Sequence, residues 1–190
     1  EFMWNLQKEQ IQKVVFALSE MKTPEQVERL LLFKYTEIHL VNLFDNMPLH
    51  MSISVGHNDM SEFILSKLHQ YPECYKKAIF HDTSVPGYEG AYAFHLLLSK
   101  GYLAQSSSSK PCENYQRLLL NELRFINNTF SPEEKKRFVM LQSRNYTLLD
   151  LAIFRCDIIL IEKIVELAKT SSMTQEEANH YIEKAKGVLD

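Results

Sequence analysis

The most informative part of this 190-residue chain runs from Asp45 to Leu68 and reads DNMPLHMSISVGHNDMSEFILSKL. Pro48 suits the first turn of a helix, because its φ is already helical and an N–H would have no partner there. Gly56 can end that helix in the left-handed conformation that a side chain disfavours, and Asn58 can cap a second helix. The second helix carries an apolar stripe that consists of Met60, Phe63, Ile64 and Leu68. The stretch therefore predicts two short helices joined by a tight turn.

This pair of helices resembles an ankyrin repeat, in which a turn, Thr-Pro-Leu-His, an inner helix, Gly-His and an outer helix follow one another. Met47-Pro48-Leu49-His50 and Gly56-His57 stand at the matching positions, with methionine in place of the threonine. The resemblance implies an all-α fold, an ankyrin-like solenoid of helical pairs, and a protein-binding function. It also implies that His50 lies inside the protein and hydrogen-bonds the backbone between repeats, rather than acting as a base or a metal ligand.

A second repeat-like unit is expected over residues 86–128. Tyr92-Ala93-Phe94-His95 aligns with the Thr-Pro-Leu-His motif, a run of leucines follows, and Gly101 stands where the helix-ending glycine is expected. His95 should therefore share the internal role of His50. A longer helix over the last part of this unit places apolar residues on one face, namely Leu119, Leu123 and Ile126.

A third unit is expected over residues 142–170. Thr147-Leu148-Leu149-Asp150 takes the place of the Thr-Pro-Leu-His motif, and Asn145 can adopt the left-handed conformation that the preceding turn needs. Cys156-Asp157 stands in place of Gly-His, so Cys156 is expected to be a small hydrophobe in the core. The outer helix should bury Ile158, Ile161, Ile164, Val165 and Ala168.

Three further helix starts are indicated by a Ser or Thr that precedes Glu or Gln by three residues. These are Thr23-Pro24-Glu25-Gln26, Ser131-Pro132-Glu133-Glu134 and Thr174-Gln175-Glu176-Glu177. A short helix is also expected from Pro72 to Phe80. The repeat spacing exceeds the family period of about 33 residues, which predicts insertions at about residues 71–85 and 102–138.

The expected organisation is a single domain over residues 1–190. Its parts are an N-terminal helical cap at 1–44, the three units at 45–70, 86–128 and 142–170, and a C-terminal capping helix at 172–190. Capping helices are needed at the ends of a repeat array, because the terminal units would otherwise expose an apolar face.

The bulk composition argues against several functions. The formal net charge of −3 argues against a nucleic-acid binder that relies on phosphate contacts. Three cysteines without a CxxC pattern indicate reduced thiols in an intracellular, cytoplasmic protein, or in the host cytosol if the chain is a secreted effector. No apolar run reaches the length that spans a bilayer, so no membrane insertion is expected. No cofactor is expected either, because GxGxxG, HExxH and similar motifs are absent.

Two alternatives to a binding module are left open by the sequence. Cys112 lies in a polar stretch and could be the nucleophile of a cysteine-dependent enzyme that uses an insertion loop and a histidine nearby in space. The chain could also be a regulatory domain of a larger enzyme. In style, irregular repeats with long insertions resemble ankyrin-bearing bacterial effectors. We favour a non-enzymatic protein–protein interaction module.

The ankyrin resemblance also implies which residues meet the partner protein, because this family binds through turn tips and the concave face of its inner helices. The expected tips are Phe44, Asn46, Tyr88, Glu89, Ala91, Arg144 and Tyr146. The expected inner-helix positions are Ser54, Val55, Ser99, Lys100, Phe154 and Arg155. Aromatic residues and arginines carry most interface energy, although a tip aromatic can also pack under its own turn. The insertion loop at residues 106–109 is the competing site.

Overall fold

The structure is a computed structural model that describes residues 12–13, 16–17, 19–31, 48–54, 56–83, 90–103 and 110–189. Helices make up 77% of the described residues, which confirms the expected all-α class. The strands in the described residues form two antiparallel pairs, each strand two residues long. The chain divides into two compact units, Glu1–Leu96 and Leu97–Asp190. The single domain expected over the whole chain stays a prediction.

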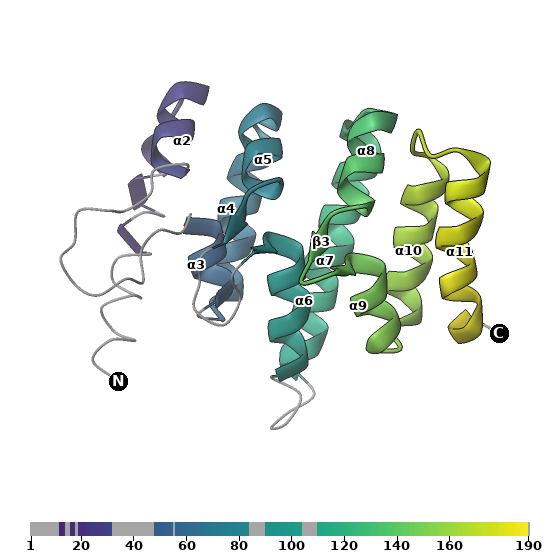
Figure 1. The fold of residues 1–190 in the computed structure, drawn as a ribbon. Helices are drawn as coiled ribbons and strands as arrows, with labels where there is room; N and C mark the ends of the chain where they lie inside the picture. Colours follow the sequence, from purple (N-terminus) through teal and green to yellow (C-terminus); the bar gives the residue numbers. More distant parts are fainter. Residues whose placement is uncertain are drawn as a thin grey trace. The chain divides into compact units, whose positions relative to one another are not determined.

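The described part of the N-terminal unit includes the helices α2 (Pro24–Leu31), α3 (Pro48–Ser54), α4 (Asn58–His69) and α5 (Pro72–Ile79). Helix α4 packs against both α3 and α5, and α2 packs against α5 (Figure 1). The expected helix start at residues 23–26 is confirmed. The Thr23 hydroxyl accepts a hydrogen bond from the Gln26 N–H, and the Gln26 side-chain oxygen accepts one from the Thr23 N–H, both at 3.3 Å.

The turn between α3 and α4 agrees only partly with the sequence prediction. Gly56 has the expected left-handed backbone, with φ 76°, and its N–H donates to the Ile53 carbonyl at 3.1 Å. The expected cap at Asn58 is wrong, because α4 begins at Asn58 and the residue before it, His57, makes no side-chain cap bond. The buried face of α4 is also rotated from the expected stripe and consists of Ser61, Ile64, Leu65 and Leu68.

A pair of buried serines explains this rotation. The hydroxyl oxygens of Ser52 in α3 and Ser61 in α4 lie 2.9 Å apart, within hydrogen-bond distance. Both residues are buried, and their small side chains let the two helices approach closely. Met60 and Phe63 are therefore left half-buried at the side of the contact. A prediction based on apolar residues alone misses this contact, because its central residues are polar.

The insertion expected at residues 71–85 forms α5 and the strand β1 (Asp82–Thr83). Strand β1 pairs with β2 (Ala91–Tyr92), with Asp82 opposite Tyr92 and Thr83 opposite Ala91. Helix α6 (Ala93–Leu103) follows β2 without a loop. The expectation that Ala91 lies at an exposed tip is wrong, because Ala91 is a buried residue of the strand.

The C-terminal unit contains residues 97–103 of α6, followed by further helices and one strand pair. These elements are α7 (Lys110–Thr129), α8 (Pro132–Val139), β3 (Gln142–Ser143), β4 (Tyr146–Thr147), α9 (Leu148–Phe154), α10 (Ile158–Lys169) and α11 (Gln175–Leu189). Helix α10 packs against α7, α8, α9 and α11, so it lies at the centre of this unit (Figure 1). The helix break expected at Gly101 is wrong, because α6 continues through it to Leu103.

A tight hairpin leads into α9. Ser143 pairs with Tyr146, and the two residues between them both have left-handed backbones, with φ 52° at Arg144 and 69° at Asn145. This is the two-residue type I′ turn that matches the twist of a hairpin. The expected left-handed Asn145 is confirmed, whereas the sequence gives no reason to expect the same conformation at Arg144.

Three reciprocal caps start the helices α8, α9 and α11. The caps at Ser131 and Glu134 and at Thr174 and Glu177 were both expected from the sequence and are confirmed. At α9, the Thr147 hydroxyl accepts from the Asp150 N–H at 3.2 Å. Burial opposes ionisation of Asp150, but its hydrogen bonds to Thr147 and its contact with Lys184 hold the pKa of the carboxyl below its ordinary value.

Helix α10 buries four of its five expected core residues, namely Ile161, Ile164, Val165 and Ala168. The expectation for Ile158 is wrong, because half of its surface (50%) is exposed. The expectation that Cys156 lies in the core is also wrong. Cys156 is exposed and has φ 54°, the same left-handed conformation as Gly56 at the equivalent turn. The turn requires a left-handed backbone at this position, whether or not the side chain is buried.

Replacing Cys156 with glycine should stabilise the protein. Glycine adopts a left-handed backbone without a Cβ penalty, so we expect the free energy of unfolding to rise by about 0.5–1 kcal/mol. Urea unfolding followed by circular dichroism measures the change. Cys156→Ala is the matched control: it removes the thiol but keeps Cβ, and should give no gain. An equal gain in both variants would mean that the thiol, not the backbone, is the destabilising feature.

Candidate interaction surface

The structure describes part of the expected partner-binding residues. Five of them lie outside the described residues: Phe44, Asn46, Val55, Tyr88 and Glu89. Lys100 lies in α6, but its side chain is not described. Ser54 lies in the N-terminal unit, where its hydroxyl donates to the Met51 carbonyl at 2.9 Å. Ser99 is half-buried in α6. The remaining four, Arg144, Tyr146, Phe154 and Arg155, lie in the C-terminal unit, around the hairpin and α9.

Two exposed aromatic side chains stand at opposite ends of this segment. Tyr146 in β4 is 56% exposed, and Phe154, the last residue of α9, is 73% exposed. Helix α9, whose seven residues span about 10 Å, begins two residues after Tyr146 and ends at Phe154. Its caps at Thr147 and Asp150 and its buried residues Leu148, Leu149 and Ala152 hold the segment in place. Tyr146 therefore does not pack under its own turn, because most of its surface is open to solvent.

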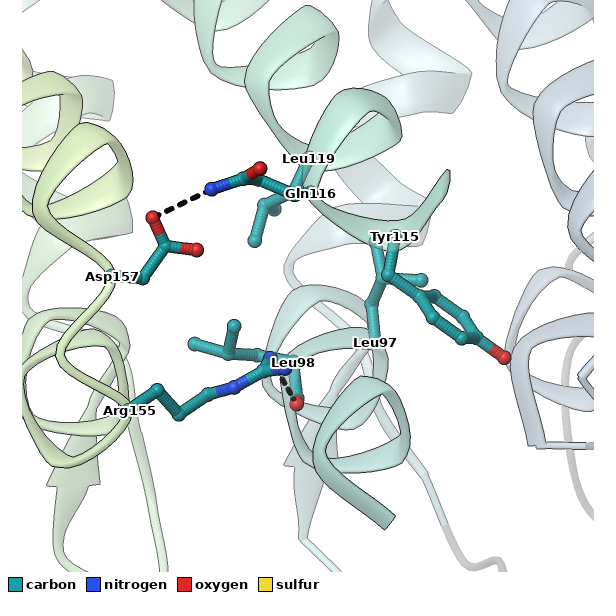
Figure 2. A pocket seen from close by; sticks show the side chains of 7 residues that line it. All are labelled: Leu97, Leu98, Tyr115, Gln116, Leu119, Arg155 and Asp157. Atoms are coloured by element: carbon teal, nitrogen blue, oxygen red, sulfur yellow. Dashed lines mark hydrogen bonds between the residues drawn. The ribbon is translucent and has the colours of Figure 1, made fainter. Parts of the chain in front are cut away.

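Arg155 plays a part that the sequence does not indicate. Its side chain is half-buried, and Nη1 donates to the carbonyl oxygen of Leu98 in α6 at 2.7 Å (Figure 2). Next to it, Asp157 caps α10 by accepting from the Leu160 N–H at 3.1 Å and also accepts from the Gln116 side chain in α7 at 2.8 Å. The turn between α9 and α10 is thereby tied to two other helices. The position of Asp157 before an apolar helix is a cap signal that sequence reasoning could have used.

A small cavity lies beside these two ties. Its walls include Leu97, Leu98, Tyr115 and Leu119, together with the polar parts of Arg155 and Asp157 (Figure 2). Burial raises the pKa of the Tyr115 hydroxyl. The cavity volume of about 10 Å³ is enough for at most one water molecule. This cavity therefore has no room for a substrate or a cofactor.

The structure bears on the predictions for Cys112, His50 and His95. Cys112 lies in the first turn of α7, so its expected place in a polar loop is wrong, and its side chain lies outside the described residues. His50 is fully buried, and its Nε2 donates to the His81 carbonyl at 3.0 Å, as expected for an internal histidine. His95 is also buried. Within the described ranges, no three His, Cys, Asp or Glu side chains gather into a metal-binding group.

No helix in the described part of the chain has both the length and the apolar character needed to cross a membrane. Comparison with known proteins gives no family assignment: the chain matches no protein-family model, no curated protein and no solved structure.

Proposed function

We propose that this chain is a protein–protein interaction module of a variant ankyrin-repeat type. The support lies in the order of its elements. Two inner helices, α3 and α9, are seven residues long, and each is followed by a left-handed turn residue, Gly56 or Cys156, and by a longer outer helix. Hairpins precede α6 and α9, and an extra helix, α5 or α8, precedes each hairpin.

The observation that carries the proposal is the exposure of Tyr146 and Phe154. Large aromatic side chains offer wide contact area and lose few rotamers on binding, so they are the residues in which interface energy is concentrated. Tyr146 is in a strand of the hairpin, and Phe154 ends α9, whose start is capped by Thr147 and Asp150. Both residues are therefore held in place before a partner arrives. Arg144, which is exposed at the hairpin tip, can add a charged contact beside Tyr146. The cysteine-enzyme alternative stays a prediction, with Cys112 in the first turn of α7 rather than in a loop.

The double variant Tyr146→Ala, Phe154→Ala should lose the partner while it stays folded. Both side chains are exposed, so their removal should change the free energy of unfolding by no more than about 0.5 kcal/mol each. Each should weaken binding by about 1–3 kcal/mol. Affinity purification from native lysate with isotope-labelled quantification would compare wild type and variant, followed by calorimetry on the partner that is recovered.

The matched control is Met140→Ala. Met140 is an exposed apolar residue at the C-terminal cap of α8 and belongs to neither the hairpin strands nor α9, so its removal should leave the recovered proteins unchanged. Arg155 is not used as a test residue, because its bond to the Leu98 carbonyl makes its loss affect packing as well. Full binding by a folded double variant would exclude this surface. If deletion of residues 106–109 then removed binding, the insertion loop would be the site.

A further inference from the structure

A groove between α7 and α10 forms a second candidate surface in the C-terminal unit. Its volume is about 450 Å³, and its apolar lining comes from Leu120 and Leu123 in α7 and Ile159 in α10. The groove lies between α7 and α10, whereas the proposed partner surface lies on the hairpin and α9. Clefts of this volume lie within the range used for ligand binding. The groove is therefore a separate site rather than an extension of the first.

The apolar surface of this groove is concentrated at one end. Ile159, in the first turn of α10, lines the groove and is 52% exposed. A helix on the surface of a protein normally places polar residues at such positions. Later turns of α10 do so, because Glu162, Lys163 and Glu166 are exposed there. At the other end of the groove, Asn127 and Asn128 of α7 provide amide groups. The groove is thus apolar near Ile159 and polar towards Asn128.

The charges on its rims are mostly positive. Arg124 of α7 is exposed, and no hydrogen bond or ion pair engages it within the described residues. Lys163 of α10 contacts Glu166 of the same helix at 2.7 Å, and both side chains are about half exposed. An exposed pair of this kind is weak, so Lys163 can turn towards a second carboxylate at little energetic expense. The groove therefore presents two cations, one on each side, against one carboxylate.

We propose that this groove binds an acidic amphipathic helix of a partner protein. Helix-in-groove recognition places apolar residues at helical spacing on the groove floor and polar residues on its rims. From Leu120 to Asn128, α7 spans about 12 Å, which matches about two turns of a bound helix. The apolar face of the bound helix would contact Leu120 and Ile159, and the carboxylates of the bound helix would pair with Arg124 and Lys163. A basic helix would meet like charges on both rims.

Two synthetic probes test this proposal on the full chain. Each is a fluorescent amphipathic peptide of about 14 residues with leucine at i, i+3, i+4 and i+7. The remaining positions are glutamate in one peptide and lysine in the other. Fluorescence anisotropy should show binding of the acidic peptide and at least about tenfold weaker binding of the basic one, with the difference reduced by salt. Arg124→Glu and Ile159→Asp should each weaken the acidic peptide about tenfold.

The matched control is Lys169→Glu, which makes the same charge change at an exposed position of α10 outside the groove. It should leave binding within about threefold of wild type, since distant exposed charges are largely screened. The Tyr146→Ala, Phe154→Ala variant should also bind the peptide normally, which separates this site from the proposed partner surface. Thermal unfolding checks that each variant is folded.

Several outcomes would overturn the proposal. Absence of acidic-peptide binding would show that the groove does not bind an acidic helix. Equal binding of both peptides would show that the charges on its rims do not select the peptide. An equal loss in Lys169→Glu and Arg124→Glu would mean that overall surface charge, not the groove, attracts the peptide. Sedimentation that shows a dimer in wild type and a monomer in Ile159→Asp would assign the groove to a second copy of this chain instead.

Discussion

The free energy of unfolding of this protein should fall by about 3 kcal/mol as the pH drops from 6.5 to about 4, because of His50. His50 is fully buried, and burial lowers its pKa from 6.5 to about 4, although the hydrogen bond to the His81 carbonyl and the nearby Asp82 act in the opposite direction. Its Nδ1 is buried without a hydrogen-bond partner in the described part of the chain. A proton there would place a positive charge in the core with no acceptor.

The sign follows from proton binding in the two states. Between pH 6.5 and about 4, the histidine of the unfolded chain takes up a proton, while His50 in the folded protein stays neutral. The unfolded state binds more protons, so stability is fully present above pH 6.5 and is lost as the pH falls. The carboxyls of Asp150 and Glu177 have pKa values below their ordinary 3.8 and 4.5, so their contributions fade at lower pH.

Urea unfolding at a series of pH values measures the effect, and the difference between wild type and His50→Gln isolates this histidine. The Gln amide can still donate to the His81 carbonyl, so the variant should lose about 1–3 kcal/mol at neutral pH mainly because it fits the buried site less well than the imidazole ring. It should also have a flatter stability profile between pH 6.5 and 4. His180→Gln, at an exposed position of α11, should keep the wild-type slope. A slope that is the same in wild type and His50→Gln would contradict the assignment, as would a bound metal that His50→Gln releases.

Replacing Tyr181 with alanine should destabilise the chain by about 3–5 kcal/mol, the usual cost of removing a buried aromatic ring. Tyr181 in α11 is buried, and its hydroxyl donates to the Val139 carbonyl at 3.1 Å. Val139 is the last residue of α8, where carbonyls have no partner within the helix. Tyr181 therefore fills the core and also satisfies the end of another helix. Burial holds the pKa of this phenol well above its ordinary value.

Tyr181→Phe separates the two contributions. It keeps the ring but leaves the Val139 carbonyl without its donor, so we expect a loss of about 1–2 kcal/mol. His180→Ala, one residue earlier and exposed, should change stability by no more than about 0.5 kcal/mol. Denaturant unfolding of all three variants gives the comparison. If Tyr181→Phe were as damaging as Tyr181→Ala, the hydrogen bond rather than the packing of the ring would dominate.

Features set by neighbouring residues were the ones that the sequence could predict. The reciprocal caps at residues 23–26, 131–134 and 174–177 form because the interacting groups are three residues apart and need no distant partner. The left-handed backbones at Gly56 and Asn145 are predictable for the same reason, since the preference belongs to the residue itself. Tyr146 follows the left-handed turn residue Asn145, and Phe154 ends the helix that this turn leads into. Both candidate surface residues could therefore be predicted from local sequence.

Features that depend on distant neighbours could not be read in this way. The buried face of α4 is set by the contact between Ser52 and Ser61, and the role of Arg155 is set by a carbonyl 57 residues away in sequence. The groove of Leu120 and Ile159 likewise exists because α7 and α10 pack together. Periodicity records which residues are apolar, but it does not record which helix they meet.

By itself, then, the sequence determined that this protein is helical, where most of its helices begin, and that Gly56 and Asn145 adopt left-handed backbones. These properties depend on interactions within about four residues, which any stretch of chain carries with it. Tertiary structure alone decided that Cys156 and Ile159 are exposed, that Arg155 and Gln116 tie the turn between α9 and α10 to other helices, and that α7 and α10 leave a groove. Exposure and grooves arise from how helix surfaces fit one another, and that fit is a property of pairs of elements.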